Sequence, residues 1–202
     1  SIIDLSPLGH QPMSYLNRYQ IVFNGEIYNF QEKHRDLAKV GYTFKSKSDT
    51  EVIMALYDKY GVNCLHHLRG MFSFAIYDTK NNTLFCARDR VGKKPFKYLY
   101  DHQNFIFASE LKAILKDPDY KKQPDFTAIH HYLTLQYCPA PLTGFMGIQK
   151  LEPGHYLLLD IAKNKLTNKC YWHLDFSKKD NFSELEWQEK ILAKLEESTK
   201  LR

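Results

Sequence analysis

Hydrophobic and polar residues alternate along several short segments of the chain, in the manner of β-strands. One such run covers residues 19–23, and Asn24-Gly25 separates it from residues 26–28. An Asn-Gly step between two alternating runs is a strong hairpin signal, so the pattern predicts a turn there. Further strands are predicted at residues 42–44, 71–77, 83–87, 96–100 and 105–108, and a last hairpin pairs residues 155–160 with 166–172.

Other segments repeat their hydrophobic residues at the spacing of amphipathic helices. The clearest start is Ser48, which forms a capping-box sequence with Glu51, and Gly61 ends that helix. Further helices are predicted at residues 30–40, 62–68, 109–115 and 126–135. Because hairpins dominate and strands do not alternate regularly with helices, the pattern predicts an α+β domain built on antiparallel sheets.

A separate unit is predicted near the C-terminus. Ser183 and Glu186 form a second capping-box sequence, and the helix that they open follows a completed hairpin. We therefore expect residues 1–176 to form one domain, and residues 177–202 to be a linker and the first helix of the next. The chain begins with Ser1 rather than Met and stops inside a helical pattern, so we expect it to be an internal part of a longer protein.

Composition and charge exclude several classes of protein. The 28 Lys and Arg residues against 23 Asp and Glu residues are scattered in twos and threes rather than in a basic stripe, so no nucleic-acid partner is expected. No apolar run approaches the ~20 residues that span a bilayer, so no membrane association is expected. The four cysteines are Cys64, Cys86, Cys138 and Cys170, and they form no CxxC pair and no close Cys/His set. This spacing predicts no metal site, and we expect reduced thiols in a cytoplasmic protein.

Candidate chemistry gathers at Asn24, Gly25 and Glu26, together with Asp49. An Asn amide beside a glycine N–H can supply two donors to a developing oxyanion. A carboxylate at Glu26 or Asp49 can hold a substrate ammonium group. The same residues also have a purely structural interpretation, as a hairpin turn and as an acid in the first turn of a helix.

Six motifs, taken in order, resemble a known family. They are SIIDLSPLGHQP from residue 1, FNGEIYN from 23, SDTEVI from 48, GMFSFAIY from 70, ARDRVGKKP from 87 and ASELKAIL from 108. Together they resemble the glutaminase half of the glutamine-dependent asparagine synthetases. That half is a class II glutamine amidotransferase domain of the N-terminal-nucleophile type. The later YCPAP, PLTGF and PGHYLLL segments are similar to the same family, so the resemblance covers residues 1–176.

The resemblance implies a fold, a reaction and a set of site residues. The fold is a four-layer αββα sandwich of two antiparallel sheets between helices, with its first strand missing from this chain. The reaction is hydrolysis of glutamine to glutamate, with the ammonia passed on for ATP-dependent amidation of aspartate. Asn24 and Gly25 correspond to the oxyanion hole, whereas Glu26, Asp49 and the backbone near Ile3 correspond to contacts with bound glutamine.

The sequence departs from the family pattern at its start. The family's nucleophile is an N-terminal cysteine that precedes the stretch matched by Ser1, and none of the four cysteines corresponds to it. Ser1 itself aligns with an internal strand, so it is not expected to be a nucleophile. We therefore expect the chain alone to lack glutaminase activity. It is also expected to bind no cofactor, because ATP and magnesium belong to the family's separate synthetase domain.

Two other functions stay open at this point. A protein of the same architecture can amidate another acceptor, such as a sugar acid in polysaccharide synthesis, or can be a non-catalytic glutaminase-like module. The partners that the resemblance implies are glutamine as the small-molecule substrate and a synthetase domain in the same chain. A homodimer is a further expectation from the family.

Overall fold

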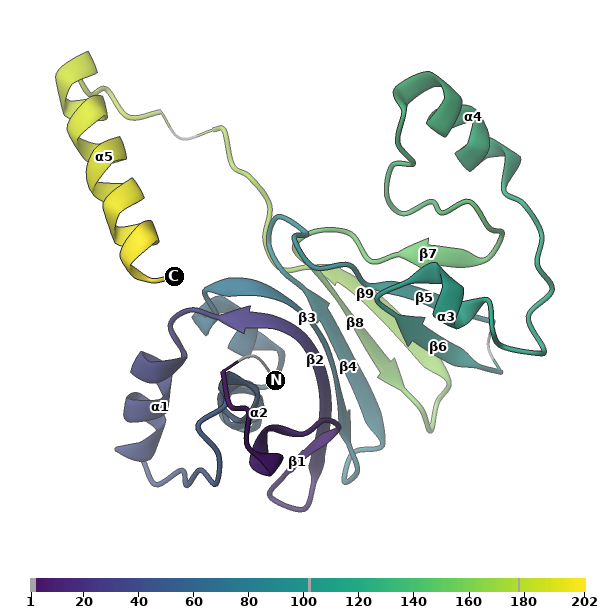
Figure 1. The fold of residues 1–202 in the computed structure, drawn as a ribbon, viewed down its shortest axis with the longest axis horizontal. Helices are drawn as coiled ribbons and strands as arrows, with labels where there is room; N and C mark the ends of the chain where they lie inside the picture. Colours follow the sequence, from purple (N-terminus) through teal and green to yellow (C-terminus); the bar gives the residue numbers. More distant parts are fainter. Residues whose placement is uncertain (1–2, 102, 178) are drawn as a thin grey trace.

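The computed structural model describes residues 3–101, 103–177 and 179–202, and within these ranges two antiparallel sheets lie between helices (Figure 1). The larger sheet has six strands in the order β1 (Met13–Tyr15), β2 (Tyr19–Ile27), β3 (Gly70–Asp78), β4 (Thr83–Arg88), β8 (His155–Asp160) and β9 (Lys165–Cys170). The smaller sheet has the order β6 (Phe105–Ala108), β5 (Lys97–Tyr100) and β7 (Ile148–Lys150). The predicted α+β sandwich of two antiparallel sheets is confirmed.

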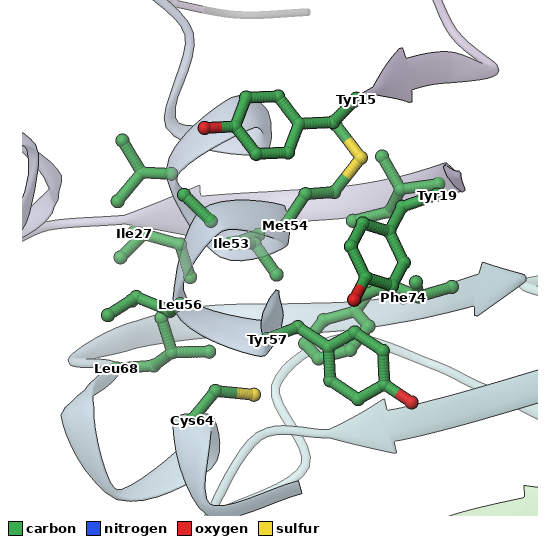
Figure 2. Close-up of a cluster of buried hydrophobic side chains, with 14 of the residues drawn as sticks. Tyr15, Tyr19, Ile27, Ile53, Met54, Leu56, Tyr57, Cys64, Leu68 and Phe74 are labelled. Carbon is green, nitrogen blue, oxygen red and sulfur yellow. The ribbon is translucent and has the colours of Figure 1, made fainter. Parts of the chain in front are cut away.

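Each space between layers contains its own hydrophobic cluster. The largest cluster joins the big sheet to helix α2 (Asp49–Tyr60), and Figure 2 shows Met54 and Tyr57 of this helix beside Tyr15 and Tyr19. A second cluster lies between the two sheets, with Cys86 and Leu157 from the large sheet, Tyr98 from the small sheet and Phe96 directly before β5 as members. A third joins the small sheet to helix α3 (Leu111–Ile114).

The alternation along β3 explains how one strand serves two of these spaces. Phe72, Phe74 and Ile76 belong to the cluster under α2, whereas Ala75 belongs to the cluster between the sheets. Successive side chains of a strand point to opposite faces, so a strand that is covered on both faces needs a nearly continuous apolar run. The segment GMFSFAIY meets that need.

Two predicted features near the first helices are wrong or half right. Ser48 caps α2 by accepting from Thr50 N at 3.2 Å, but Glu51 does not complete a capping box. The Glu51 carboxylate instead accepts from the backbone N–H groups of Lys45 and Ser46. Residues 42–44 form no strand. They belong to a loop after α1 (Phe30–Ala38), and the side chains of Tyr42 and Phe44 pack against the core cluster under α2.

The predicted turn at Asn24-Gly25 is also wrong. Strand β2 continues through both residues, and Asn24 pairs with Ser73 while Gly25 pairs with Phe72. The sequence pattern missed β1 and β7, which have three residues each, too few to show an alternation. Residues 62–68 were predicted as a helix and form the 3₁₀-helix η2 (Gly61–His67), and another short 3₁₀ segment is η1 (Pro7–Gly9).

Two helices predicted in the second half of the chain are present. Helix α4 (Phe126–Leu135) has the predicted bounds, and α5 (Glu184–Lys200) begins at the predicted cap. Helix α5 lies outside the sandwich (Figure 1) and forms an ion pair with it between Arg69 and Glu197 at 3.0 Å. No helix in the described ranges combines the length and the hydropathy needed to cross a membrane.

Replacement of Ser183 by alanine is expected to destabilise α5 by about 1 kcal/mol. The Ser183 hydroxyl accepts from Glu186 N, and the Glu186 carboxylate accepts from Ser183 N at 2.8 Å. Because α5 has no buried residue, its stability depends on such local contacts. Hydrogen exchange of the α5 amides measures the effect, with Ser177→Ala, another exposed serine, as the control. Equal protection in both variants would contradict a capping role.

Candidate active site

Gly25 presents its backbone N–H at an open edge of the large sheet. Tyr28 N donates to Arg69 O at 2.8 Å, and hydrogen bonds alternate along an antiparallel ladder. This alternation directs the N–H groups of Phe23, Gly25 and Ile27 away from β3. Strand β1 pairs only with residues 19–21, so it does not cover Gly25.

Side chains from elsewhere accept the neighbouring N–H groups on that edge. Phe23 N donates to Gln11 Oε1 at 2.6 Å, and Ile27 N donates to Asp49 Oδ2 at 2.9 Å. The Gly25 N–H lies between these two occupied donors. It is therefore a donor at a defined place on the strand, aimed outward from the sheet.

The Asn24 side chain projects from the face of β2 that is turned toward the small sheet. Its Nδ2 donates to Ser109 Oγ at 3.1 Å, which bridges the two sheets. Asn24 and Ser109 line a pocket of about 240 Å³ together with Gln11, Ser73, Phe96 and Phe107, among others. Most of the residues that line this pocket are apolar, and the polar ones are Gln11, Asn24, Ser73 and Ser109.

Two carboxylates lie beside these donors. Asp49, the first residue of α2, is buried, and burial raises its pKa. Hydrogen bonds from Ile27, Thr50 and Ser48 oppose that rise, whereas the negative charge of Glu26 adds to it. Among the described residues no basic side chain forms an ion pair with either carboxylate. Two neighbouring acids of this kind are suited to bind a cationic group.

Ile3 is half-buried and adjoins Asp4, which lies near the same end of α2. The adjacent Asp4 carboxylate accepts from Lys47 N at 2.9 Å, in the loop that leads into Asp49. The structure therefore brings Asn24, Gly25, Glu26, Asp49 and Ile3 into one region around the end of β2. Of these five, only Asn24 lines the apolar pocket. Ser1 lies outside the described residues.

Sequence reasoning missed two polar residues of this region. Gln11 accepts the Phe23 N–H, and Ser109 accepts from the Asn24 amide although 85 positions separate these two residues. The only available signal for Ser109 was its place in the motif ASELKAIL, which indicated no role.

None of the four cysteines lines the pocket beside Asn24. Cys64 and Cys86 are fully buried, and burial raises the pKa of both thiols, which confirms a structural thiol at Cys86. Cys138 is half-buried and donates to Leu142 O, while Cys170 is exposed at the end of β9. The described ranges contain no group of three His, Cys, Asp or Glu side chains arranged to hold a metal ion.

Comparisons with known proteins identify the family to which the chain belongs. A family model described as "Glutamine amidotransferase domain" matches residues 1–172. Asparagine synthetase [glutamine-hydrolyzing] 3 of Bacillus subtilis is 38% identical over 182 residues, covering 88% of this chain and 29% of that protein. Asparagine synthetase [glutamine-hydrolyzing] 1 of the same organism is 37% identical over 195 residues, covering 96% and 29%.

Solved structures share the fold at lower identity. Glutamine phosphoribosylpyrophosphate amidotransferase from B. subtilis superposes with a TM-score of 0.58 at 19% identity, covering 84% of this chain and 33% of that chain. The chain spans about three tenths of the length of the two synthetases. Since the family model matches well over half of the residues, the chain belongs to the glutamine amidotransferase domain family.

Proposed function

We propose that this chain is the glutaminase part of a glutamine-dependent asparagine synthetase. In this proposal it hydrolyses glutamine to glutamate and supplies ammonia for ATP-dependent amidation of aspartate. The observation that carries the proposal is the arrangement around β2, where oxyanion donors at Asn24 and Gly25 lie beside the acidic pair Glu26 and Asp49. Glutamine carries a cationic α-ammonium group and a neutral side-chain amide, and it therefore needs both kinds of group.

The proposed mechanism assigns each group one task. Glu26 and Asp49 pair with the α-ammonium group, and the backbone near Ile3 makes a further contact. When a nucleophile adds to the side-chain amide carbon, the carbonyl oxygen becomes an oxyanion that accepts from the Asn24 amide and the Gly25 N–H. The carbon–nitrogen bond then breaks, a proton passes to the nitrogen, and ammonia leaves. Water hydrolyses the remaining acyl group to glutamate and frees the nucleophile.

The attacking group in this proposal is the N-terminal cysteine of the full-length protein, whose α-amine acts as the base. It is none of Cys64, Cys86, Cys138 and Cys170, because none of them lines the pocket that contains Asn24. ATP and magnesium are assigned to the synthetase domain rather than to this chain. A full-length sequence without a cysteine directly after the initiator Met would contradict the proposed nucleophile.

The test is an assay of the full-length protein with glutamine, ATP and magnesium. Formation of glutamate together with an equal amount of asparagine, made from aspartate, would support the proposal. Amidation of uronic acids in place of aspartate would assign another acceptor to the same glutaminase. If calorimetric titration detected no glutamine binding, the domain would be a non-catalytic module. Light scattering tests the homodimer that is also part of the proposal.

Replacement of Asp49 by asparagine is expected to raise KM for glutamine about 10- to 100-fold, because a hydrogen bond to a charged group contributes ~1.5–3 kcal/mol. The free energy of unfolding at neutral pH is expected to stay the same or rise, since the change removes a buried charge whose pKa burial raises. Urea unfolding and steady-state kinetics measure the two effects. Asp180→Asn, in the exposed linker, is the matched control.

The raised pKa of Asp49 also predicts a pH dependence of binding. As pH falls through that pKa, the carboxyl group becomes neutral and no longer pairs with an ammonium, so KM for glutamine is expected to rise. The free energy of unfolding has the opposite pH dependence to glutamine binding. Because the pKa is higher in the folded state, protonated Asp49 favours folding, and this contribution is lost as pH rises through the folded-state pKa. An acid-insensitive KM in the wild type would contradict the role of Asp49.

A further inference from the structure

Among the described residues, one side-chain hydrogen bond holds the Asn24 amide, and it reaches the segment directly after the small sheet. Its Nδ2 donates to Ser109 Oγ at 3.1 Å, and Ser109 follows directly after β6. Asn24 is otherwise an exposed side chain, so packing does not restrain it. The terminal torsion of an Asn side chain is broad, and an exposed amide without a partner can turn freely.

An oxyanion donor is effective only if it is oriented before charge develops. The Asn24 amide nitrogen carries two N–H groups. When one is donated to Ser109, rotation of the amide is restricted and the second N–H remains available to another acceptor. The contact thus orients the donor without consuming it.

Ser109 is itself anchored by a charged group. Lys97 Nζ donates to Ser109 O at 2.6 Å, and Lys97 pairs with Ala108 across β5 and β6. The Lys97 side chain is half-buried, and burial lowers its pKa, with the nearby charges of Lys150 and Arg88 acting in the same direction. This hydrogen bond from the Lys97 ammonium to the carbonyl restrains the backbone of Ser109, which directly follows β6.

We propose that Ser109 is a positioning residue for the glutaminase, whose hydroxyl orients the Asn24 amide, and that Lys97 supports Ser109 through its carbonyl group. This inference rests on the proposed function. It concerns a residue that touches the oxyanion donor and not the reacting atoms, so its effect must pass through Asn24.

The experiment uses the full-length protein and measures glutamine hydrolysis at saturating and limiting glutamine. Ser109→Ala is expected to lower kcat about 3- to 10-fold, the effect of losing one neutral hydrogen bond. KM for glutamine is expected to change less than about twofold, because the affected donor acts mainly in the transition state. Ser109→Thr retains a hydroxyl and is expected to restore most of the rate. Thr79→Ala is the control and is expected to have no effect. It removes an exposed hydroxyl directly after β3, at the end of that strand far from the Asn24–Ser73 pair.

A double-mutant cycle separates positioning from a structural role. In the Asn24→Ala background, Ser109→Ala is expected to lower kcat by less than about twofold, because the amide that it orients is absent. An equal loss in both backgrounds, or no loss in either, would overturn the inference. Lys97→Gln, which keeps the Ser109 hydroxyl, is expected to lower kcat less than Ser109→Ala does. It provides a second test if Ser109→Ala unfolds, and an unchanged rate would then count against the inference.

The cycle also distinguishes the two levels of proposal. If Asn24→Ala lowers kcat strongly and Ser109→Ala does not lower it, the glutaminase stands and the positioning role of Ser109 fails. If the wild-type protein does not hydrolyse glutamine, or Asn24→Ala leaves its rate unchanged, the proposed site fails and the role of Ser109 fails with it.

Discussion

Replacement of Asn24 by alanine in the full-length protein is expected to lower kcat for glutamine hydrolysis about 100- to 1,000-fold, the usual range for loss of one oxyanion donor. The side chain is exposed and contributes one hydrogen bond between the sheets, so the free energy of unfolding should change little. KM for glutamine should change much less than kcat, because an oxyanion forms only as the reaction proceeds. Release of glutamate under saturating glutamine measures the effect.

Asn168 supplies the matched control for this variant. It is an exposed asparagine within a strand of the same sheet, in β9, and it pairs with Leu157. Asn168→Ala should therefore reproduce the loss of an exposed strand amide without altering the rate. An Asn24→Ala protein with an unchanged rate would remove Asn24 from the site. A large loss of unfolding free energy in Asn24→Ala would indicate a structural effect instead.

Replacement of Gly25 by alanine is expected to cost more than about 3 kcal/mol of unfolding free energy, as the sum of overpacking and backbone strain. A Cβ on Gly25 would lie 2.1 Å from Met71 O and 2.8 Å from Phe72 Cα, which are backbone atoms of the partner strand. The φ angle of +152° is also one that residues with a side chain rarely adopt. Urea unfolding of the variant measures the loss.

The clash at Gly25 has a counterpart on β3. A Cβ on Gly70 would lie 2.2 Å from Glu26 O, so Gly70→Ala is expected to destabilise the same pair of strands. Gly144→Ala is the control, since no atom lies within 4 Å of its Cβ position and its φ is not positive. Gly25→Ala and Gly144→Ala proteins of equal stability would contradict the close approach of β2 and β3.

The close approach also explains why the Asn-Gly signal predicted the wrong structure. Glycine is common in tight turns because it accepts unusual φ angles, but it also permits two backbones to approach closely. Residues 24 and 25 alone do not distinguish these uses. Nine consecutive pairs between β2 and β3 stabilise an extended strand and override the local preference for a turn.

Local features were determined by the sequence itself. Helix α4, the hairpin of β8 and β9 and the cap at Ser183 all depend on residues a few positions apart, and each was predicted. The acidic and amide character of Glu26, Asp49 and Asn24 was also evident from the sequence. Their chemistry was therefore predictable, although their arrangement was not.

Tertiary structure alone decided how those groups meet. The Gly25 N–H is left at an open edge because the pairing of β1 with β2 ends at Ile21 of β2. The Asn24 amide meets Ser109 because the two sheets stack, and Asp49 meets Ile27 N because α2 begins against β2. Such contacts join residues that are far apart in the chain. Periodicity and capping are local properties, and they carry no information about which distant backbone or side chain will lie opposite.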